Sequence, residues 1–369
     1  MEGRRRLVPA LFPFMRIVVD VMGGDHGSGV VVNGVVSALR AEGNDRIRQV
    51  FLVGNEKEIH PVLARHHCTD PRVEVVHASE VLTMEDKPVE GLRRKRDCSI
   101  VRAVELVKDG KADAVISPGN TGGVVAAATL KLRPLPGVDR PGIAAVIPAP
   151  DNDFVLLDAG ANIECRPRHL LHYAIMGSLY SQHILGYKRP RVGLLSVGTE
   201  DVKGNDLTLE AFKLCKLVDI NFIGNVEGHD LFANRVDVVV CDGFVGNIVL
   251  KTCESLAKGF FSWLKRELTK APHRAIGAFL AQAAFRTIKR RVDPDNIGGA
   301  PLLGLNGTVM IAHGSSSDRA IMNAIRITSE AISHHLVEHI QQDIAEANQR
   351  VEAMSAPSRG AAVAALASS

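Results

Sequence analysis

The sequence predicts an α/β fold in three layers, with a mostly parallel sheet between two layers of helices. Short apolar runs rich in valine and isoleucine alternate with longer helical stretches, as in parallel strands joined by crossover helices. Aromatic residues make up only 4% of the chain, while hydrophobic residues make up 46%. That composition favours buried parallel strands over an all-β sandwich.

The elements are placed by apolar periodicity, with helical stretches filling most of the gaps between strands. The connection Pro148–Asp153 is too short for a parallel crossover and predicts an antiparallel hairpin. The expected strands are Arg16–Val21, Gln49–Val53, Val73–His77, Ala112–Ser117, Ile143–Ile147, Phe154–Asp158, Arg191–Val197, Ile220–Gly224 and Val236–Cys241. The expected helices include Val30–Arg40, Ser99–Lys108, Pro167–Leu185 and Asp206–Cys215.

The segment 256–291 differs from the rest and predicts an amphipathic helical hairpin inserted into the domain, with its turn at Thr269–Arg274. It carries nine Lys and Arg residues against one acidic residue, Glu267, and the only tryptophan, Trp263. A basic amphipathic hairpin can lie on anionic lipid. The alternative is a core or dimer-interface hairpin, and both roles can hold together. The two stripes are Leu256, Phe260, Leu264, Leu268 and Ile276, Leu280, Ala284, Ile288.

We expect one domain over residues 15–345, flanked by disordered segments. Residues 1–14 combine Arg4–Arg6 with a short apolar stretch broken by prolines, which favours a disordered extension, or a true start at Met15, over a signal peptide. Residues 349–369 are rich in alanine and serine and predict a disordered tail.

The bulk properties indicate a cytoplasmic protein. No run of 18 apolar residues is present, and the six cysteines form no CxxC pair, which gives no support for zinc and suits a reducing compartment. The net charge of +3 gives no argument for a nucleic-acid partner, and we expect none.

Glycines and small polar residues follow six of the expected strands. In an open parallel sheet, ligands bind outside the carboxyl ends of the strands. Glycine lets backbone approach a ligand closely, and a helix N-terminus favours negative charge, so these loops predict an anion site. The residues are Gly23, Gly24, Asp25, Gly119, Asn120, Thr121, Gly122, Asp158, Gly160, Asn162, Thr199, Lys203, Asn205, Glu227, Asp242, Gly243, Gly246 and Asn247.

Several familiar catalytic motifs are absent. The sequence has no GxxxxGK[ST] and no HExxH or GxSxG, and the loop at Gly23–Gly29 lacks the GxGxxG register. A P-loop ATPase is therefore disfavoured, and a dinucleotide site has only weak support.

Taken together, the loops resemble the acyl-acyl-carrier-protein:phosphate acyltransferase family of bacterial phospholipid synthesis, from about Arg16 to about Ala345. Small departures are Pro118 for the usual alanine, Arg166 for lysine and Cys98 for serine, together with Ser317-Asp318 after His313. The strings that carry the resemblance are Asp20–Asp25, Ser117–Gly122, Gly160–Cys165, Ala174–Ser178, Gly198–Glu200, Lys203–Asp206, Asn221–Gly228, Cys241–Asn247 and His313–Ser316.

The resemblance implies a fold like that of the isocitrate and isopropylmalate dehydrogenases, a homodimer, and no metal or organic cofactor. It implies transfer of a fatty acyl group from acyl carrier protein to inorganic phosphate, and the acyl phosphate then feeds a membrane glycerol-3-phosphate acyltransferase. The nearest alternative is a phosphate acetyl- or butyryltransferase that uses acyl-CoA. A dehydrogenase of the same fold and an inactive scaffold are further alternatives.

The chemistry of this transfer asks for positioning and hydrogen-bond donors rather than a strong acid or base, because phosphate is already anionic and a thiolate leaves readily. Asn120, Asn162 and Asn247 are the candidate donors, and Lys203 and His313 the candidate charges on phosphate or sulfur. Asp25, Asp158 and Asp242 are expected to orient loop amides.

The proposed reaction also suggests roles for one cysteine and two basic clusters. Cys165 could form an acyl-enzyme, but we expect a buried small side chain and direct transfer. The basic clusters Arg93–Arg96 and Arg286, Lys289–Arg291 are solvated helix faces or docking sites for an acidic carrier.

Overall fold

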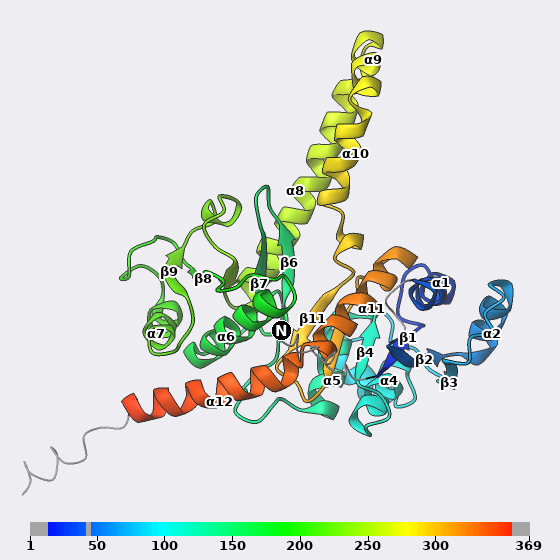
Figure 1. Cartoon of the computed structure of the whole chain (residues 1–369), viewed down its shortest axis with the longest axis horizontal. Coiled ribbons are helices and arrows are strands. Elements are labelled where there is room, and N and C mark those ends of the chain that lie inside the picture. The colour runs from blue at the N-terminus through cyan, green and yellow to red at the C-terminus, as the bar shows by residue number, and fades with distance from the viewer. Residues whose placement is uncertain (1–13, 42–45, 356–369) are drawn as a thin grey trace, which may run out of the picture.

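The computed structural model describes residues 14–41 and 46–355, so the expected extension 1–14, apart from Phe14, lies outside the described residues (Figure 1). The chain forms two sheets where the sequence predicts one. The first has the order β3-β2-β1-β4-β12-β11-β5, and only the β12–β11 and β11–β5 pairs are antiparallel. Its strands are β1 (Met15–Asp20), β2 (Ile47–Gly54), β3 (Val73–His77), β4 (Ala114–Ser117), β5 (Gly142–Ile143), β11 (Ala300–Leu303) and β12 (Thr308–Ile311).

Helices cover both faces of the first sheet. Because successive strand residues point to opposite faces, Ile17 and Val19 pack with α1, α2 and α11, while Val18 packs with α4 and α5. This alternation gives the three layers that the sequence predicts. The helices are α1 (Ser28–Arg40), α2 (Glu56–Arg65), α3 (Pro88–Arg94), α4 (Ser99–Lys108), α5 (Thr121–Leu132) and α11 (Asp318–Ser333).

The second sheet has the order β6-β7-β10-β8-β9. The β6–β7 pair is antiparallel, which confirms the predicted hairpin, and the other pairs are parallel. α6, α7 and α12 cover one face, and the start of α8 packs on the other. The elements are β6 (Ala145–Pro148), β7 (Asp153–Leu157), β8 (Val192–Leu195), β9 (Phe222–Val226), β10 (Val238–Val240), α6 (Pro167–His183), α7 (Asp206–Cys215) and α12 (Leu336–Ser355).

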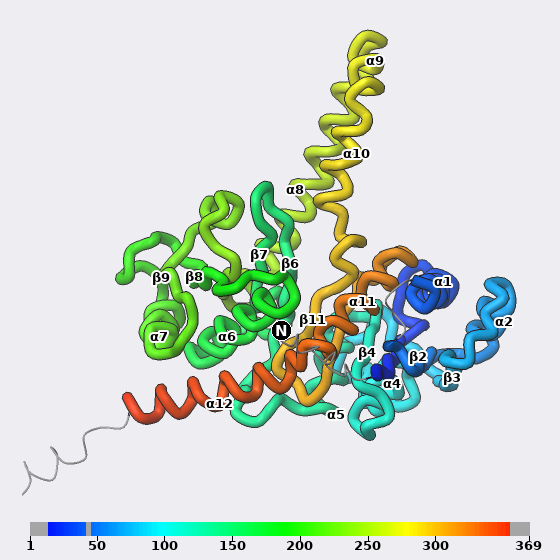
Figure 2. Tube along the Cα trace, viewed as in Figure 1, coloured from blue at the N-terminus to red at the C-terminus, as the bar shows by residue number. Residues whose placement is uncertain are grey.

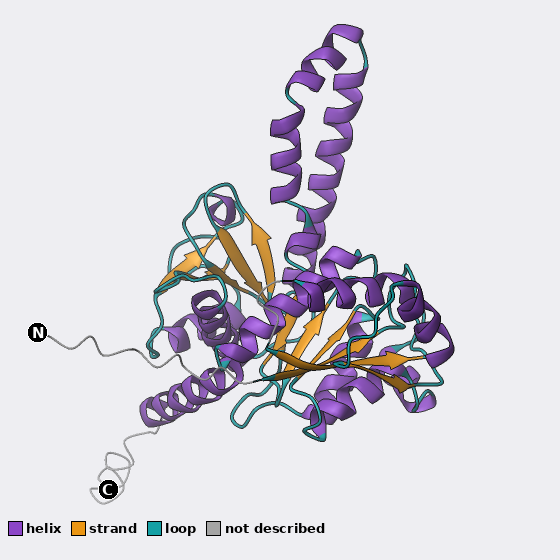
Figure 3. Cartoon of the chain, turned by 45° about the vertical axis from the view of Figure 1, so that its right-hand side comes forward, coloured by secondary structure: helices purple, strands orange, loops and turns teal. Residues whose placement is uncertain are grey.

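A helical hairpin projects from the body between the two sheets (Figures 1 and 3). It consists of α8 (Gly243–Thr269), α9 (Pro272–Leu280) and α10 (Gln282–Arg291). α8 begins 13 residues before the expected start at Leu256, because Asp242 caps it directly after β10. None of the helices over the described residues is long and apolar enough to cross a membrane.

The C-terminal part of the chain differs from the sequence prediction in two respects. Strands β11 and β12 were not expected, and they bring residues near 300 back beside β4, as the chain trace shows (Figure 2). Residues 349–355 belong to α12 rather than to a disordered tail, because Ile340, Ile344, Ala347 and Val351 continue one apolar stripe onto the core. Residues 356–369 lie outside the described part.

Candidate active site

The loops after β1, β4 and β12 meet, because these three strands are neighbours in the first sheet. The Asp25 N–H donates to the Gly314 carbonyl at 2.8 Å. A Cβ on Gly23 would lie 2.5 Å from the Gly119 Cα, so the two backbones touch in a way that only glycine allows. Gly23, Gly24, Asp25 and Gly119 therefore form one loop group with the His313 segment, which we call the first loop group.

A buried carboxylate that sequence reasoning missed as a site residue supports this group. Asp20 accepts the Ser117 hydroxyl at 2.7 Å and the Met22 N–H at 3.1 Å, and Ser117 in turn accepts the Gly119 N–H at 3.1 Å. Burial raises the pKa of Asp20. Its place at the end of an apolar strand, just before a glycine pair, was the available signal.

Asn120 is occupied by structural hydrogen bonds. Its Oδ1 accepts the Gly123 N–H at 3.0 Å, and its Nδ2 donates to the carbonyls of Thr83 and Met84 at 3.3 and 3.2 Å. The donors that this loop offers to an anion are thus the N–H groups of Thr121 and Gly122, in the first turn of α5, where a helix has no internal acceptors.

Asp158 organises the loop after β7. Its fully buried carboxylate accepts backbone N–H groups from Ile143 at 3.0 Å, Gly160 at 3.1 Å, Ala161 at 2.9 Å and Asn162 at 2.7 Å. Burial raises the pKa of Asp158, and these donors act in the opposite direction. The carboxylate therefore fixes backbone and is not placed to move a proton.

Asn162 ties that loop to α8. Its Nδ2 donates to Pro141 O at 2.6 Å and to Tyr173 Oη at 2.9 Å, and its carbonyl accepts the Gly243 N–H at 2.8 Å. A Cβ on Gly246 would lie 1.9 Å from the Asp158 carbonyl oxygen. The Asp158 loop and the first turn of α8, capped by Asp242 through the Val245 N–H at 2.9 Å, form the second loop group.

Asn247 is the half-buried side chain of this second group that faces outward. A Cβ on Gly160 would lie 3.4 Å from the Asn247 Cβ, so the two residues are in contact. Within residues 14–41 and 46–355, the Asn247 amide makes no hydrogen bond to protein. It can therefore donate to a substrate oxygen.

The two groups are joined. Ala159 N donates to Ile143 O at 2.9 Å, and Ile143 belongs to β5 of the first sheet. Ala159, Ala161 and Leu250 of α8 pack on the same apolar cluster as Val124 of α5.

Lys203 and its neighbours lie on the loops after β8 and β9. Lys203 is exposed, and its carbonyl accepts Ser196 Oγ and Asn225 Nδ2, both at 3.3 Å. Asn205 caps α7, Thr199 is exposed, and Glu227 lies 3.2 Å from His229. Across the described ranges, no hydrogen bond or ion pair links this third group to the other two.

A hydrogen bond to His313 indicates which ring nitrogen of the neutral imidazole carries the hydrogen. Its Nδ1 accepts the Ser315 N–H at 3.1 Å, so the neutral ring carries its hydrogen on Nε2. The ring is exposed at the first loop group and presents one N–H donor.

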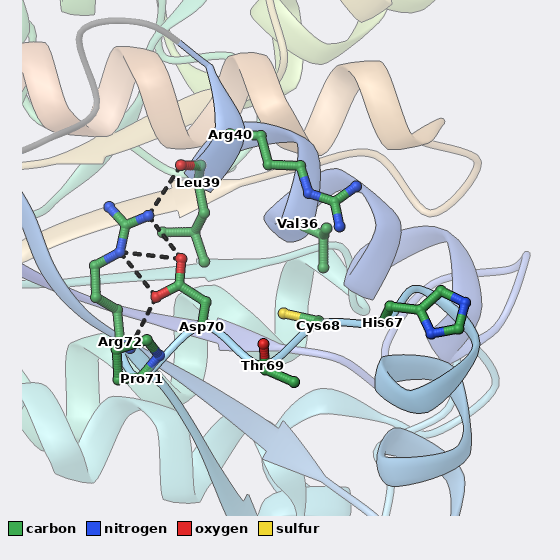
Figure 4. A pocket seen from close by; sticks show the side chains of 9 residues that line it. All are labelled: Val36, Leu39, Arg40, His67, Cys68, Thr69, Asp70, Pro71 and Arg72. Atoms are coloured by element: carbon green, nitrogen blue, oxygen red, sulfur yellow. Dashed lines mark hydrogen bonds and ion pairs between the residues drawn. The ribbon is translucent and has the colours of Figure 1, made fainter.

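Two cavities help to locate the site. One of about 550 Å³, lined by Arg40, Cys68, Asp70 and Arg72, lies just before β3 begins, at the amino end of the strands (Figure 4). The candidate loops follow the carboxyl ends of the strands, so this cavity lies at the opposite edge of the sheet. Another of about 760 Å³ opens beside Cys165. Among the described side chains, no three His, Cys, Asp or Glu residues are grouped to hold a metal.

Comparison with known proteins identifies the chain. Residues 15–339 match the family described as Fatty acid synthesis protein. The chain belongs to this family. It is 46% identical over 330 residues to a phosphate acyltransferase of Pelotomaculum thermopropionicum, covering 89% of this chain and 95% of that one. It is 43% identical over 350 residues to the phosphate acyltransferase of Geotalea daltonii, covering 94% and 100%. The family match and these phosphate acyltransferase relatives, which are 43–46% identical over most of the chain, show that it is an acyltransferase.

Solved structures confirm the fold class. A phosphotransacetylase from Streptococcus pyogenes superposes with a TM-score of 0.59 at 18% identity, covering 86% of this chain and 94% of that one. The EutD phosphotransacetylase from Staphylococcus aureus gives a TM-score of 0.54 at 16% identity, covering 87% and 96%. At these identities the likeness shows the shared α/β fold alone.

Proposed function

We propose that the chain transfers a fatty acyl group from the thioester of acyl carrier protein to inorganic phosphate. The observation that carries the proposal is the pair of joined loop groups, held rigid by buried Asp20 and Asp158, which presents helix-terminal N–H groups and the free Asn247 amide. An anion and a carbonyl oxygen can both be bound by such donors without proton transfer. The named relatives act on phosphate and acyl groups, which agrees with this chemistry.

In this mechanism a phosphate oxygen attacks the thioester carbon, the C–S bond breaks, and the carrier leaves as a thiolate. The N–H groups of Thr121 and Gly122 bind phosphate, and His313 Nε2–H and Lys203 supply a further donor and a positive charge. Asn247 donates to the developing oxyanion, a contribution of roughly 3–4 kcal/mol in comparable sites.

Transfer is direct rather than through an acyl-enzyme. Burial raises the pKa of Cys165 to about 11, so at neutral pH its sulfur is a thiol and a poor nucleophile. The sulfur lies 3.6 Å from the Asn162 carbonyl and 3.9 Å from Tyr173 Oη, where it packs as part of the Asp158 loop.

The test is release of free carrier from palmitoyl-carrier protein. Release that depends on added phosphate supports the proposal, and release without phosphate, or none, refutes it. Acetyl-CoA and butyryl-CoA in the same assay separate the reaction from that of a phosphate acetyl- or butyryltransferase, which would prefer them.

Acyl carrier protein docks on the cluster Arg93, Arg94 and Arg96. Arg93 and Arg94 end α3, and the loop before α3 accepts hydrogen bonds from Asn120, so the cluster borders the first loop group. Lys95 is left out because it is half-buried and held by the carboxylate of Asp86 at 2.5 Å. Arg94 lies 4.0 Å from the same carboxylate but remains exposed, so it stays in the cluster. Positive charge beside the site would steer an acidic carrier toward it.

The hairpin gives the protein its dimer contact and its contact with the membrane surface, where the acyl phosphate reaches a glycerol-3-phosphate acyltransferase. α9 and α10 bury no residue within the described chain, and Phe279 and Leu280 at the tip are 73% and 79% exposed. Lys289, Arg290 and Arg291 end α10 at the base of the hairpin, where Arg291 pairs with Asp153 at 2.9 Å. The exposed apolar surface suits a partner copy along the stem and a lipid surface at the tip.

A further inference from the structure

Three arginines line a cavity beside the second loop group. It has a volume of about 760 Å³ and opens next to Cys165, which follows the Asp158 loop. Arg140 comes from the segment before β5, and Arg166 and Arg168 come from the start of α6. Arg140 and Arg166 are exposed and form no ion pair within residues 14–41 and 46–355, so their guanidinium groups are open to a ligand.

A buried histidine lines the same cavity with an unused donor. His169 is only 7% exposed, and its Nδ1 accepts the Arg166 N–H at 3.2 Å, so the neutral ring carries its hydrogen on Nε2. In the described part of the chain this Nε2 has no hydrogen-bond partner, since the Asp139 carboxylate lies 3.9 Å away. Burial lowers the pKa of His169, so the ring is neutral near pH 7 and offers one N–H to a ligand.

Arg168 also has a donor without an acceptor. Its Nε is buried and, across the described ranges, makes no hydrogen bond. The nearest carboxylate oxygen, from Asp139, lies 3.8 Å away, which is too far for a hydrogen bond. A buried cationic donor without an acceptor is unfavourable, so an anion that approaches this guanidinium from the cavity would be stabilised.

The charge balance of the lining favours such an anion. Three guanidinium groups face two carboxylates, Asp139 and Glu164, and α6 begins here at Pro167, so its dipole adds positive potential. Guanidinium groups bind pairs of phosphate oxygens through two parallel hydrogen bonds. The lining therefore fits a phosphate group.

The cavity lies within reach of the proposed reacting carbonyl. Cys165 Sγ is 3.6 Å from the Asn162 carbonyl oxygen, which accepts the Gly243 N–H at 2.8 Å, and Asn247 lies one turn farther along α8, about 6 Å away. The thioester of acyl carrier protein is carried on a phosphopantetheine arm, in which about 13 bonds, or about 16 Å when extended, separate phosphorus from sulfur. With the thioester at Asn247, the phosphate end of the arm can therefore reach the cavity.

We propose that this cavity binds the phosphate group of the phosphopantetheine arm, through Arg140, Arg166, Arg168 and the Nε2–H of His169. The proposal rests on the proposed function and adds to it recognition of the arm itself, separate from docking of the carrier surface on α3. The other source of the same chemistry is the inorganic phosphate substrate, and the experiment distinguishes the two.

The test compares octanoyl thioesters of three thiols: carrier protein, phosphopantetheine, and pantetheine, which lacks the phosphate. The cavity variant is Arg140→Gln with Arg166→Gln, and it should fold normally because both side chains are exposed. The control variant is Arg189→Gln with Arg326→Gln, which removes the same charge at two exposed positions outside the cavity.

The phosphate on the thiol should decide the outcome. The unmodified chain should have a KM about tenfold lower for the phosphopantetheine thioester than for the pantetheine thioester. The cavity variant should raise KM about tenfold for the carrier and phosphopantetheine thioesters, and leave both kcat and the KM for the pantetheine thioester unchanged. KM values equal to those of the control variant would overturn the proposal. A raised KM for inorganic phosphate, measured with the pantetheine thioester, would assign the cavity to that substrate and would also overturn it.

A binding measurement separates this proposal from the proposed function. Calorimetric titration of the full chain with phosphopantetheine, and with pantetheine, reports occupancy without turnover. Phosphopantetheine should bind about tenfold more tightly than pantetheine, and only the cavity variant should lose this difference. That result supports the cavity even if phosphate-dependent release of carrier fails. Equal affinity for the two ligands in the unmodified chain would overturn the cavity and leave the proposed function intact.

Discussion

The Asp158 loop and the outer part of the hairpin are held by opposite means, although α8 belongs to both. The loop after β7 has its N–H groups satisfied by one buried carboxylate, and glycines of α8 pack against its backbone. In α8 the only buried residues are Gly243 and Gly246, at the start of the helix, so the remainder of α8 buries none. α9 and α10 bury none either. The loop is thus specified by contacts inside the chain, whereas the outer part of the hairpin buries none of its residues on the rest of the described chain.

The largest effect is expected for Asp158→Ala. It leaves several buried N–H groups without an acceptor, each costing about 1–3 kcal/mol, so the free energy of unfolding should fall by at least about 3 kcal/mol and activity should be lost. Urea unfolding measures the first quantity and phosphate-dependent release the second. Asp201→Ala is the control, because the Asp201–Lys216 pair at 2.8 Å is solvent-exposed. Equal stability of the two variants would contradict an organising role for Asp158.

Two glycines of α8 test the difference between the packed start of this helix and its exposed stem. A Cβ at Gly246 would meet the Asp158 carbonyl at 1.9 Å, whereas a Cβ at Gly259 would meet no atom within 4 Å. Gly246→Ala should therefore destabilise the protein by about 1–3 kcal/mol through overpacking. Gly259→Ala should stabilise it by up to about 1 kcal/mol through helix propensity. Thermal unfolding of both variants gives the signs, and the same sign for both would contradict the division of α8 into a packed start and an open stem.

The same division explains what the sequence could predict. Periodicity places α1, α4, α6 and α7 to within two residues, because each buries one face on its own sheet. It misses β11 and β12, each four residues long, because such short runs become strands only by pairing with distant partners.

The split into two sheets follows the same rule. The expected strand Ile143–Ile147 breaks at Ala144, whose N–H donates to Pro301 O at 3.0 Å, so the chain passes from one sheet to the other. The loop positions of the site could be predicted from strand ends. The roles of Asn120 as a cap and of Tyr173 as a partner of Asn162 could not, because they depend on contacts distant in sequence.

The hairpin tip should affect binding to lipid and leave stability unchanged. Replacing Ile276, Phe279 and Leu280 by Asp removes exposed apolar surface, so the free energy of unfolding should change by less than about 0.5 kcal/mol. Flotation with vesicles that contain anionic lipid should be lost. Undiminished flotation, or strong destabilisation, would show that the tip packs on the protein instead.

A smaller effect is expected at the exposed arginines of α3. Replacing Arg93 and Arg94 by Glu should raise KM for the carrier substrate several-fold at low salt and leave kcat unchanged, because the change acts on encounter. The matched control reverses Arg326, which is paired with Glu330 at 2.7 Å on α11. If KM at low salt equals that of the control variant, the arginines of α3 do not dock the carrier.

The smallest effect is expected at Cys165, although it lies inside the organised loop. Cys165→Ala keeps every hydrogen bond that Asp158 accepts, so turnover should stay within about twofold if transfer is direct. Because burial raises the pKa of this thiol to about 11, its alkylation by iodoacetamide should be slow at neutral pH and accelerate as the pH rises toward that value. Loss of turnover in a folded Cys165→Ala protein would instead require an acyl-enzyme. The loop would then act through a nucleophile rather than through the backbone donors that Asp158 holds in place.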